Sequence, residues 1–455
     1  MTGNRWRRSL LVAVAALGLA GATRAELRIE LKDGRVFVLP FERDEVARME
    51  FDGVPVEAAD LGVRIDDPRP QPAEGAAEGH IELAAAEEAK RKRGRILKVG
   101  PGQTFALPSE AAAAARNGDT VEIYPGTYQD VAIWRADRLT IRGVGGRPRI
   151  DAAGGGAAGK AVWVIAGRKV LVENVELTGS RVPDKNGAGI RAEGGDLTLR
   201  EVLIHGNEIG ILSALDFKGE LRIERSEFHS NIVPDWEAAG VPPGHNIYIG
   251  EAKPFVLIGS WIHGAVDGHN VKSRASENRI LYNRIEDDPG PASSYLVDIA
   301  EGAPTLIMGN LLVESAASPN RVILSIAAEK NAPGAETVIA YNTILRPLEQ
   351  SVAVANRGSG PVRLVNNLIV GPGRTAEGGV LLQGTLDTRS FRFADPARSD
   401  WRPTPGSPAI DAAIAARPWR KVKLEPTWSY RHPLTLEPRS RLGRGFDLGA
   451  YEAGP

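Results

Sequence analysis

A pair of short apolar strands joined by a tight turn recurs along the chain from Ile96 onward, and this repeat constrains the fold more than any other feature. One copy reads Val170-Leu-Val-Glu-Asn-Val-Glu-Leu177. Successive turns are 27, 24, 34, 23, 27, 32 and 25 residues apart, so the loops vary while the strand pair is constant. The equivalent turn positions are Val175, Val202, Ser226, Ser260, Asn283, Asn310, Asn342 and Asn367.

A repeat of this length, with two or three short strands, is what one coil of a parallel β-helix requires. One coil cannot bury its inner face alone, so stacked coils build a single elongated core. A β-propeller blade would need about 40 residues and four strands. We therefore expect an all-β chain that folds as a right-handed parallel β-helix over residues 96–399, with about nine to eleven coils between Ile96 and roughly Arg374.

Asparagine occupies the same turn in the four successive coils that contain Asn283, Asn310, Asn342 and Asn367. Stacked amides can form hydrogen bonds along the axis of the coils, and asparagine tolerates a left-handed backbone. We expect these four residues to be structural.

The flanking segments differ from the repeat. Leu27–Leu31 and Arg35–Phe41 alternate in polarity around Asp33-Gly34, which predicts a hairpin in a small β unit over residues 26–56. Residues 57–95 are rich in Ala, Glu, Pro and Arg and are expected to be a linker. Residues 108–118 predict a capped helix that covers the first coil, and residues 400–455 are expected to close the far end.

The N-terminus has the three parts of a secretory leader, namely early arginines, an apolar run from Leu10 to Ala20, and small residues ending at Ala22 and Ala25. The apolar run is too short to span a bilayer. We expect residues 1–25 to be a signal peptide, with cleavage after Ala22 or Ala25, and the protein to be periplasmic or secreted, without membrane insertion once the signal is removed.

Charge and cysteine content exclude several classes of function. The formal net charge of −1 becomes −5 once a leader with four arginines and no acidic residue is removed. Nucleic acid is therefore not an expected partner, because counterion release needs a basic face. The absence of cysteine excludes disulfides, zinc–thiolate sites and thiol nucleophiles. The 51 glycines and 31 prolines are typical of a turn-rich protein, which a helical bundle is not.

Five of the seven histidines lie between His205 and His269. Within this region polar residues recur at the coil spacing: 24 residues separate His245 from His269, and 24 separate Tyr248 from Lys272. Ser294 follows His269 by 25 residues, and Asp298 follows Lys272 by 26. Because residues one coil apart lie about 4.8 Å above one another, we expect two adjacent columns on one face: His245, His269 and Ser294 in one, and Tyr248, Lys272 and Asp298 in the other.

The first coil and the final segment resemble those of the pectate-lyase-like, right-handed β-helix superfamily of secreted carbohydrate-active proteins. The resemblance covers Ile96 to Glu452 and is closest to a group of exported bacterial proteins of unassigned activity. The residues that carry it are Val99–Gln103, Ala111–Ala115, Gly118–Gly126, Leu139–Gly143, Thr404–Ala412 and Asp447–Glu452.

Lys272-Ser273, with Asn278 and Tyr282-Asn283 downstream, resembles the Lys-Ser segment of alginate and chondroitin lyases with β-helix folds, in which that lysine is the base. Those enzymes carry an Arg-His-Gly segment one coil later, whereas Ser293–Asp298 contains no arginine. Gly268-His269 is similar to the Gly-His-Gly segment of polygalacturonases, whose catalytic aspartates precede the histidine. Here Asp287, Asp288 and Asp298 follow it.

The columns carry the groups that β-elimination of a uronic acid needs, namely a cation for the carboxylate, a base and an acid. Lys272 would be the base if burial and neighbouring cations lowered its pKa. Arg274 or Arg284 would hold the carboxylate, and His269, His245 or Tyr248 would protonate the leaving oxygen. The expected substrate-binding residues are Asn246, Asn270, His263, Ser294, Tyr295, Asp298 and Trp261.

These residues predict an exported protein that binds or acts on an acidic polysaccharide, as a lyase or an epimerase. The alternative is a non-catalytic glycan-binding or structural β-helix protein of the cell envelope. No cofactor is expected, although Asp287, Asp288 and Asp298 leave a calcium site open as a further alternative.

Overall fold

The computed structural model describes residues 94–454 in full and, before them, the backbone of five short strands. The chain divides into two units, residues 1–91 and 92–455, which are described separately. Most of the predicted signal peptide and nearly all of the predicted linker lie outside the described residues.

In the first unit, three strands pair antiparallel in the order β1-β2-β3: β1 (Ala13–Leu17), β2 (Arg24–Glu30) and β3 (Val36–Glu42). β4 (Met49–Phe51) and β5 (Val54–Val56) form a separate antiparallel pair. The predicted Asp33-Gly34 turn lies between β2 and β3, outside the described residues.

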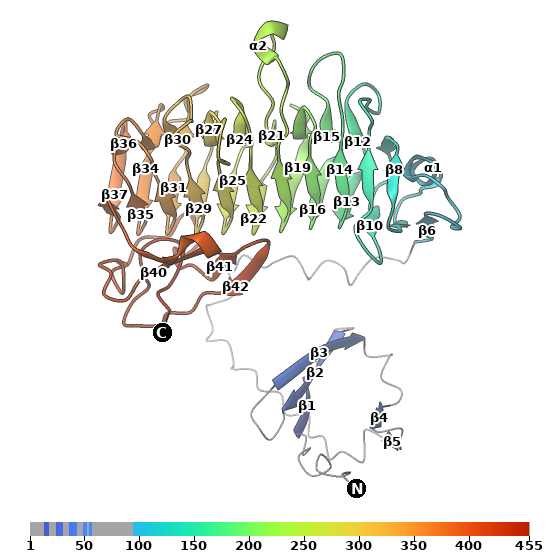
Figure 1. The fold of residues 1–455 in the computed structure, drawn as a ribbon, viewed down its shortest axis with the longest axis horizontal. Helices are drawn as coiled ribbons and strands as arrows, with labels where there is room; N and C mark the ends of the chain where they lie inside the picture. Colours follow the sequence, from blue (N-terminus) through green and yellow to red (C-terminus); the bar gives the residue numbers. More distant parts are fainter. Residues whose placement is uncertain are drawn as a thin grey trace. The chain divides into compact units, whose positions relative to one another are not determined.

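The second unit contains three long parallel sheets, and each coil contributes one strand to each of them (Figure 1). Coils β7–β9 to β34–β36 are ten complete coils within residues 94–454, in agreement with the number expected from the repeat.

Sheet I has 12 strands. They are β6 (Ile96–Val99), β7 (Thr120–Ile123), β10 (Thr140–Gly143), β13 (Arg168–Glu173), β16 (Gly195–Arg200), β19 (Lys218–Glu224), β22 (Phe255–Ile258), β25 (Asn278–Leu281), β28 (Thr305–Met308), β31 (Thr337–Ala340), β34 (Val362–Val365) and β37 (Val380–Gln383). Sheet II has 11 strands. They are β8 (Thr127–Gln129), β11 (Arg149–Asp151), β14 (Glu176–Thr178), β17 (Leu203–His205), β20 (Glu227–His229), β23 (Trp261–His263), β26 (Arg284–Glu286), β29 (Leu311–Val313), β32 (Thr343–Leu345), β35 (Leu368–Val370) and β38 (Leu386–Thr388). Sheet III has ten strands. They are β9 (Ala132–Trp134), β12 (Ala161–Ile165), β15 (Ala188–Ala192), β18 (Ile209–Ser213), β21 (Ile247–Ile249), β24 (His269–Ser273), β27 (Tyr295–Ile299), β30 (Val322–Ile326), β33 (Val352–Asn356) and β36 (Arg374–Glu377).

Inward-facing aliphatic side chains stack in register to form the core. On sheet I, one fully buried column runs through ten coils: Val121, Ile141, Val172, Leu199, Ile223, Leu257, Ile280, Ile307, Ile339 and Leu364. Each coil thus covers the apolar surface of the coil before it, which explains why the strand pair repeats so closely in the sequence.

The predicted asparagine column is confirmed at the corner between sheets I and II. Asn283 donates its backbone N–H and its side-chain amide to Oδ1 of Asn310 at 2.8 and 2.9 Å, and Asn310 donates to Asn342 in the same way. Asn342 bonds to Asn367 at 2.9 and 3.0 Å. All four side chains are fully buried, so the ladder belongs to the core.

The residue with the left-handed backbone conformation, in contrast, lies one position earlier in the turn than expected. Positive φ angles occur at Tyr282, Gly309, Tyr341 and Asn366, each of which directly precedes a ladder asparagine. The asparagines are therefore selected by their hydrogen bonds, because the conformational strain of the turn lies on the neighbouring residue.

A second buried ladder, which the repeat analysis did not identify, runs along the corner between sheets II and III. The amide of Asn207 donates to Asn231 at 3.1 Å, Asn231 to Asn246 at 2.9 Å, and Asn246 to Asn270 at 2.8 Å. Asn246 and Asn270 are fully buried. Their expected role in substrate binding is corrected here, because their amides are used inside the core.

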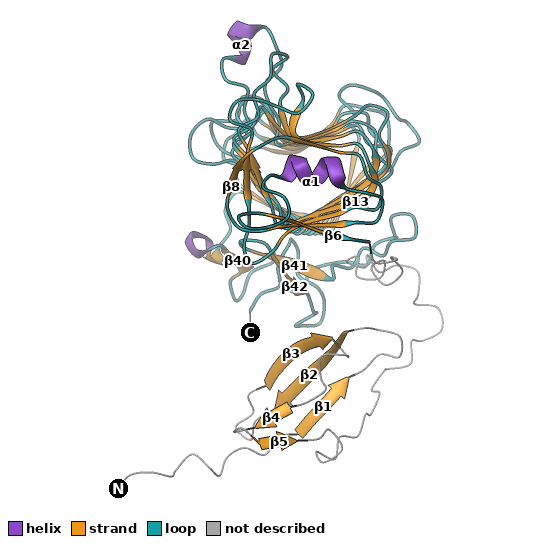
Figure 2. Cartoon of the chain, turned by 90° about the vertical axis from the view of Figure 1, so that its right-hand side faces the viewer, coloured by secondary structure: helices purple, strands orange, loops and turns teal. Residues whose placement is uncertain are grey.

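Helix α1 (Pro108–Ala114) covers the first coil, as Figure 2 shows along the axis of the coils. Glu110 accepts the backbone N–H groups of Ala106 and Leu107 at 2.8 and 3.2 Å, which satisfies donors before the first helical turn. Helix α2 (Trp236–Ala239) lies in the long loop between β20 and β21. Neither helix is long and apolar enough to cross a membrane, and the same holds for every helix within residues 94–454.

The C-terminal segment packs along the side of the coils instead of covering their far end. It contains β39 (Phe393–Asp395), a 3-10 helix (Pro396–Arg398), β40 (Asp400–Pro403), β41 (Trp428–Arg431) and β42 (Thr435–Pro438). Ala450 and Tyr451 pack on Leu311, and Ala409 and Leu448 pack on Leu368 and Val370, so the segment covers the outer face of sheet II. At the last coil, Leu381 and Leu382 stay 55% and 50% exposed.

We predict that Asn310→Ala strongly destabilises the β-helix. The substitution removes the acceptor of two buried N–H groups and leaves a cavity, and each unpaired buried group costs about 1–3 kcal/mol. Urea denaturation should therefore show a loss of about 3 kcal/mol or more. Asn331→Ala is the matched control, because the Asn331 amide bonds to Ser359 at the surface and should contribute at most about 0.5 kcal/mol. Equal effects of the two substitutions would contradict the role of the ladder.

Candidate functional site

The predicted column of Tyr248, Lys272 and Asp298 forms on the outer face of sheet III. Tyr248 of β21 is in register with Lys272 of β24, and Lys272 is in register with Asp298 of β27. Val271 and Ser273, on either side of Lys272, are buried, so strand alternation directs Lys272 outward. The coil spacing in the sequence thus located this column correctly.

Lys272 and Arg274 converge on one carboxylate, that of Glu329. Nζ of Lys272 lies 2.6 Å from Oε1 of Glu329, and Nε and Nη2 of Arg274 lie 2.9 and 2.6 Å from Oε2. Burial opposes the charge of Glu329, but the two cations outweigh it and lower the pKa of the carboxyl. The structure therefore presents a two-cation site that binds an ionised carboxylate.

Tyr248 completes this cluster. The guanidinium of Arg274 donates to the Tyr248 hydroxyl oxygen and lies 5.0 Å from the ring centroid. Nζ of Lys272 lies 5.8 Å from the same centroid. A phenol hydroxyl, a guanidinium and an ammonium are thus within reach of a single bound group.

The surroundings of Lys272 differ from those that base catalysis by lysine would require. Its ammonium lies between Glu329 and Asp298, with Nζ 3.6 Å from Oδ2 of Asp298. Burial raises the pKa of Asp298, and Lys272 partly offsets this effect. Two carboxylates therefore face Lys272, whereas the expected base role relied on neighbouring cations.

The second predicted column is confirmed for its two histidines. The rings of His245 and His269 stack with centroids 4.8 Å apart, and Tyr295 follows in register with His269, its ring 4.8 Å away. Tyr295 therefore takes the place expected for Ser294. Ser294 instead donates its backbone N–H to Gly268 and is 6% exposed, so its expected exposure to substrate is corrected.

Both stacked histidines are neutral at physiological pH. Burial, followed by the charge of Lys272, lowers the pKa of His269 to about 3. Burial also holds the pKa of His245 well below its usual value. The backbone N–H of His269 donates to Nδ1 of His245 at 2.9 Å, so the ring proton of His245 is on Nε2.

Trp261, His263 and Arg284 lie on sheet II, and the structure does not bring them to the Lys272 cluster. The indole of Trp261 donates to Glu286 at 2.8 Å and stacks on His263 with centroids 3.9 Å apart. Arg284 donates to the Ser399 hydroxyl at 2.9 Å, under the C-terminal segment. The expectation that Arg284 lies near Lys272 and could hold the substrate carboxylate there is therefore corrected.

His263 belongs to a second histidine stack, with His205 and His229, on sheet II. Successive ring centroids are 4.9 and 5.0 Å apart. Burial opposes the charge of His263, but Asp288 and Glu227 outweigh it and raise the pKa of His263 to about 9. Burial, together with the charge of His263, lowers the pKa of His229 to about 4.

The three aspartates considered for calcium do not converge. Asp288 accepts from His263 at 3.0 Å, Asp287 accepts from Ser293 at 2.6 Å, and Asp298 faces Lys272. Across residues 94–454, no group of three or more His, Asp or Glu side chains is arranged as metal ligands.

The charged residues that surround Arg274 were not predicted from the sequence. A cavity of about 540 Å³ beside it is lined by Lys218, Lys253, Lys330, Glu251 and Glu301, among others. Lys330 pairs with Glu301 at 3.2 Å. Arg274, Glu301, Glu329 and Lys330 come just after the strands of sheet III, a recurrence of charge that could have identified this corner.

We predict that the stabilising effect of His263 disappears at alkaline pH. A group with a folded pKa of about 9 and an unfolded value of about 6.5 stabilises the fold fully below about pH 6.5 and loses this effect as the pH rises through about 9. The melting temperature of His263→Gln should therefore lie several degrees below wild type at pH 6 and approach it at pH 10. His229→Gln is the control, because His229 stays neutral across this range, and its difference from wild type should be constant. A difference in melting temperature between His263→Gln and wild type that does not change with pH would contradict the assigned pKa of His263.

Neither a protein family model nor a curated protein matches the chain. Solved structures do match. Pectate lyase Pel9A is 15% identical with a TM-score of 0.55, over 80% of this chain and 97% of that chain. An alginate lyase from Paenibacillus sp. str. FPU-7 is 14% identical with a TM-score of 0.45, over 65% and 99%. Pectin methylesterase PemA from Erwinia chrysanthemi is 11% identical with a TM-score of 0.33, over 56% and 79%. Together with the three parallel sheets, the first of these similarities shows that the second unit has the right-handed parallel β-helix fold of pectate lyases.

Proposed function

We propose that the protein binds an acidic polysaccharide along the outer face of sheet III and cleaves it by β-elimination at Tyr248, Lys272 and Arg274. The observation that carries the proposal is the convergence of Lys272 of β24 and Arg274, the residue directly after β24, on a single carboxylate. In the complex, a uronate carboxylate of the chain takes the place of Glu329. From the leader-like N-terminus, we also propose that the protein is exported to the periplasm or secreted.

Charge and position support this assignment. Arginine binds a carboxylate through two parallel N–H groups, and lysine adds a compact positive charge. The neighbouring cavity adds Lys218, Lys253 and Lys330, beside Glu251 and Glu301, around the corner of the coil. A polymer with a carboxylate on every sugar can therefore contact the Lys272 cluster and the adjacent cavity with consecutive units.

The reaction needs a neutralised carboxylate, a base and an acid. Lys272 and Arg274 neutralise the carboxylate, which stabilises the charge that develops when the adjacent carbon loses its proton. Tyr248, whose hydroxyl oxygen accepts a hydrogen bond from the Arg274 guanidinium, removes that proton as the phenolate. A carbon–carbon double bond forms as the bond to the glycosidic oxygen breaks, and the Tyr248 hydroxyl returns the proton to that oxygen.

The histidines are not assigned the acid role. A group with a pKa of about 3, as His269 has, carries no proton to give at neutral pH. We assign His245, His269 and Tyr295 to the wall of the site, where their rings pack in a column beside the Tyr248 cluster. Asp298 orients Lys272 from the next coil.

An epimerase would share the first step and return the proton to the opposite face of the same carbon. The non-catalytic alternative, a glycan-binding or structural protein of the cell envelope, is supported by the ion pairs that Lys272 and Arg274 already form with Glu329. The test is to incubate the protein with alginate, pectate and glycosaminoglycans and follow the ultraviolet absorbance of the unsaturated product. In D₂O, an epimerase would incorporate deuterium without chain cleavage, and binding without either signal would favour the non-catalytic class.

We predict that Glu329→Gln tightens the binding of acidic oligosaccharides. The substitution removes the carboxylate that competes for Lys272 and Arg274, so the dissociation constant should fall by about three- to tenfold, as expected for a charged hydrogen bond. Lys272→Ala and Arg274→Ala should weaken binding by at least as much. Calorimetry at low salt measures all three variants, since salt screens the charges. The control is Glu377→Gln, which alters another acidic residue of sheet III and should change nothing. Weaker binding by Glu329→Gln would overturn the assignment.

We predict that Tyr248→Phe lowers kcat by about 100-fold or more, the usual contribution of acid–base catalysis, with little change in substrate affinity. Tyr295→Phe is the matched control, because it removes a hydroxyl from the same face without touching the Arg274 contact, and kcat should stay within about threefold of wild type. A Tyr248→Phe variant with normal kcat would exclude Tyr248 as the proton carrier.

A further inference from the structure

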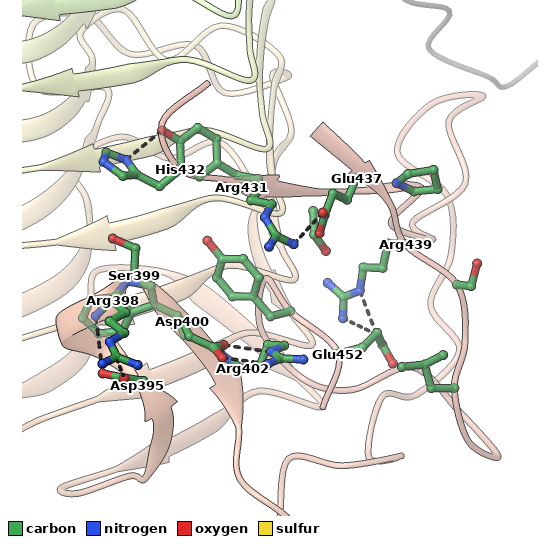
Figure 3. Close-up of a pocket in the computed structure, with 17 residues that line it drawn as sticks. Asp395, Arg398, Ser399, Asp400, Arg402, Arg431, His432, Glu437, Arg439 and Glu452 are labelled. Carbon is green, nitrogen blue, oxygen red and sulfur yellow. Dashed lines mark hydrogen bonds and ion pairs between the residues drawn. The ribbon is translucent and has the colours of Figure 1, made fainter. Parts of the chain in front are cut away.

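The C-terminal segment encloses a cavity of about 820 Å³ that the β-helix repeat does not explain (Figure 3). All of its lining residues lie between Asp395 and Glu452, far from Lys272 in the chain. Its volume is within the range typical of small-ligand sites. The cavity rests on sheet II, because Ser399 accepts from Arg284 and the ring of His432 contacts the ring of Trp261 edge-on, with centroids 4.5 Å apart.

The charges on the cavity wall cancel in pairs. Arg402 forms a two-pronged ion pair with Asp400 at 2.8 and 2.7 Å, and Arg431 pairs with Glu437 at 2.6 Å. Figure 3 marks these pairs together with the two remaining ones on the wall, Arg439 with Glu452 at 2.6 Å and Arg398 with Asp395 at 3.7 Å. Four arginines thus face four carboxylates, and the wall is formally neutral.

The ion pairs leave both donors and acceptors free for a ligand. Arg402 uses Nε and Nη2 on Asp400, and Arg431 uses Nη1 on Glu437, so further N–H groups and carboxylate lone pairs lie at the wall. The arginines of both pairs are well exposed. A hydroxyl group both donates and accepts, and it can therefore bridge such a pair without disturbing it.

The deeper wall is aromatic. Trp401, Tyr430 and Tyr451 line the cavity together with His432. Tyr451 is 9% exposed, and within residues 94–454 its hydroxyl forms no hydrogen bond. A hydroxyl at the cavity wall can both donate and accept, so it is available to a molecule bound in the cavity.

We propose that this cavity is a second carbohydrate site, which binds a neutral sugar unit. The apolar faces of the sugar ring pack on the aromatic side chains, and its hydroxyls bond to the Arg402–Asp400 and Arg431–Glu437 pairs and to Tyr451. An acidic sugar is disfavoured, because each arginine already faces a carboxylate and the wall carries no net positive charge. The proposal is independent of the chemistry at sheet III.

Isothermal titration calorimetry on the full chain tests the proposal with neutral tetrasaccharides of glucose, mannose, galactose and xylose, compared with tetragalacturonate. At least one neutral tetrasaccharide should bind, with an affinity that changes less than about twofold between low and high salt, because no net charge is involved. Tyr451→Phe should weaken this binding by about three- to tenfold. Tyr124→Phe, in the first coil, should leave it unchanged.

The charge balance gives a second test. Asp400→Asn leaves the cavity with one excess positive charge, so this variant should gain salt-sensitive binding of tetragalacturonate that wild type lacks at this site. The proposal is overturned if no neutral tetrasaccharide binds, if Tyr451→Phe binds as wild type does, or if wild-type binding of tetragalacturonate depends on Tyr451. Because these readouts use Tyr451 and Asp400, they are separate from the outcome for Lys272 and Arg274.

Discussion

Hydrogen bonding between the buried asparagines of neighbouring coils holds the coils in a single register, and the outward-facing columns depend on that register. Each amide accepts two N–H groups from one coil and donates to carbonyls of others. A slip of one residue would place aliphatic side chains outside and polar ones inside. It would also leave buried amides unpaired. The ladders at the two corners of sheet II exclude such slips, so side chains 24 to 27 residues apart meet reliably.

On sheet III, this register brings charges of opposite sign to adjacent coils. Lys272 lies in β24 and Arg274 directly follows that strand, Asp298 comes from β27 of the next coil, and Glu329 comes from the loop after β30. Burial and the positive charge of Lys272 disfavour the charged form of the neighbouring His269, which therefore stays neutral although Asp298 lies close to it.

Sheet II has a different role, because the C-terminal segment covers much of its outer face. Where it is covered, aliphatic residues such as Leu311 and Leu368 face outward and are buried. Where the outer face of sheet II is not covered, a stack of histidines with acidic neighbours takes the place of these aliphatic residues. Trp261 and Arg284 lie at the boundary and support the cavity of the C-terminal segment. The outer face of sheet III thus presents a charged surface, whereas the C-terminal segment on sheet II presents a neutral cavity with aromatic walls.

The sequence by itself determined the coil repeat, the first asparagine ladder, the helix over the first coil and the column of Tyr248, Lys272 and Asp298. These features follow from a spacing of about one coil, which is visible along the chain. The sequence could not determine on which of the three sheets a side chain lies, since loop lengths vary, and it therefore grouped Trp261, His263 and Arg284 with Lys272. It also missed Glu329, which is 57 residues from its partner Lys272, and the cavity around Tyr451. Only the tertiary structure decided those contacts, because they depend on how loops and the C-terminal segment fold back on the coils, and no repeat encodes that.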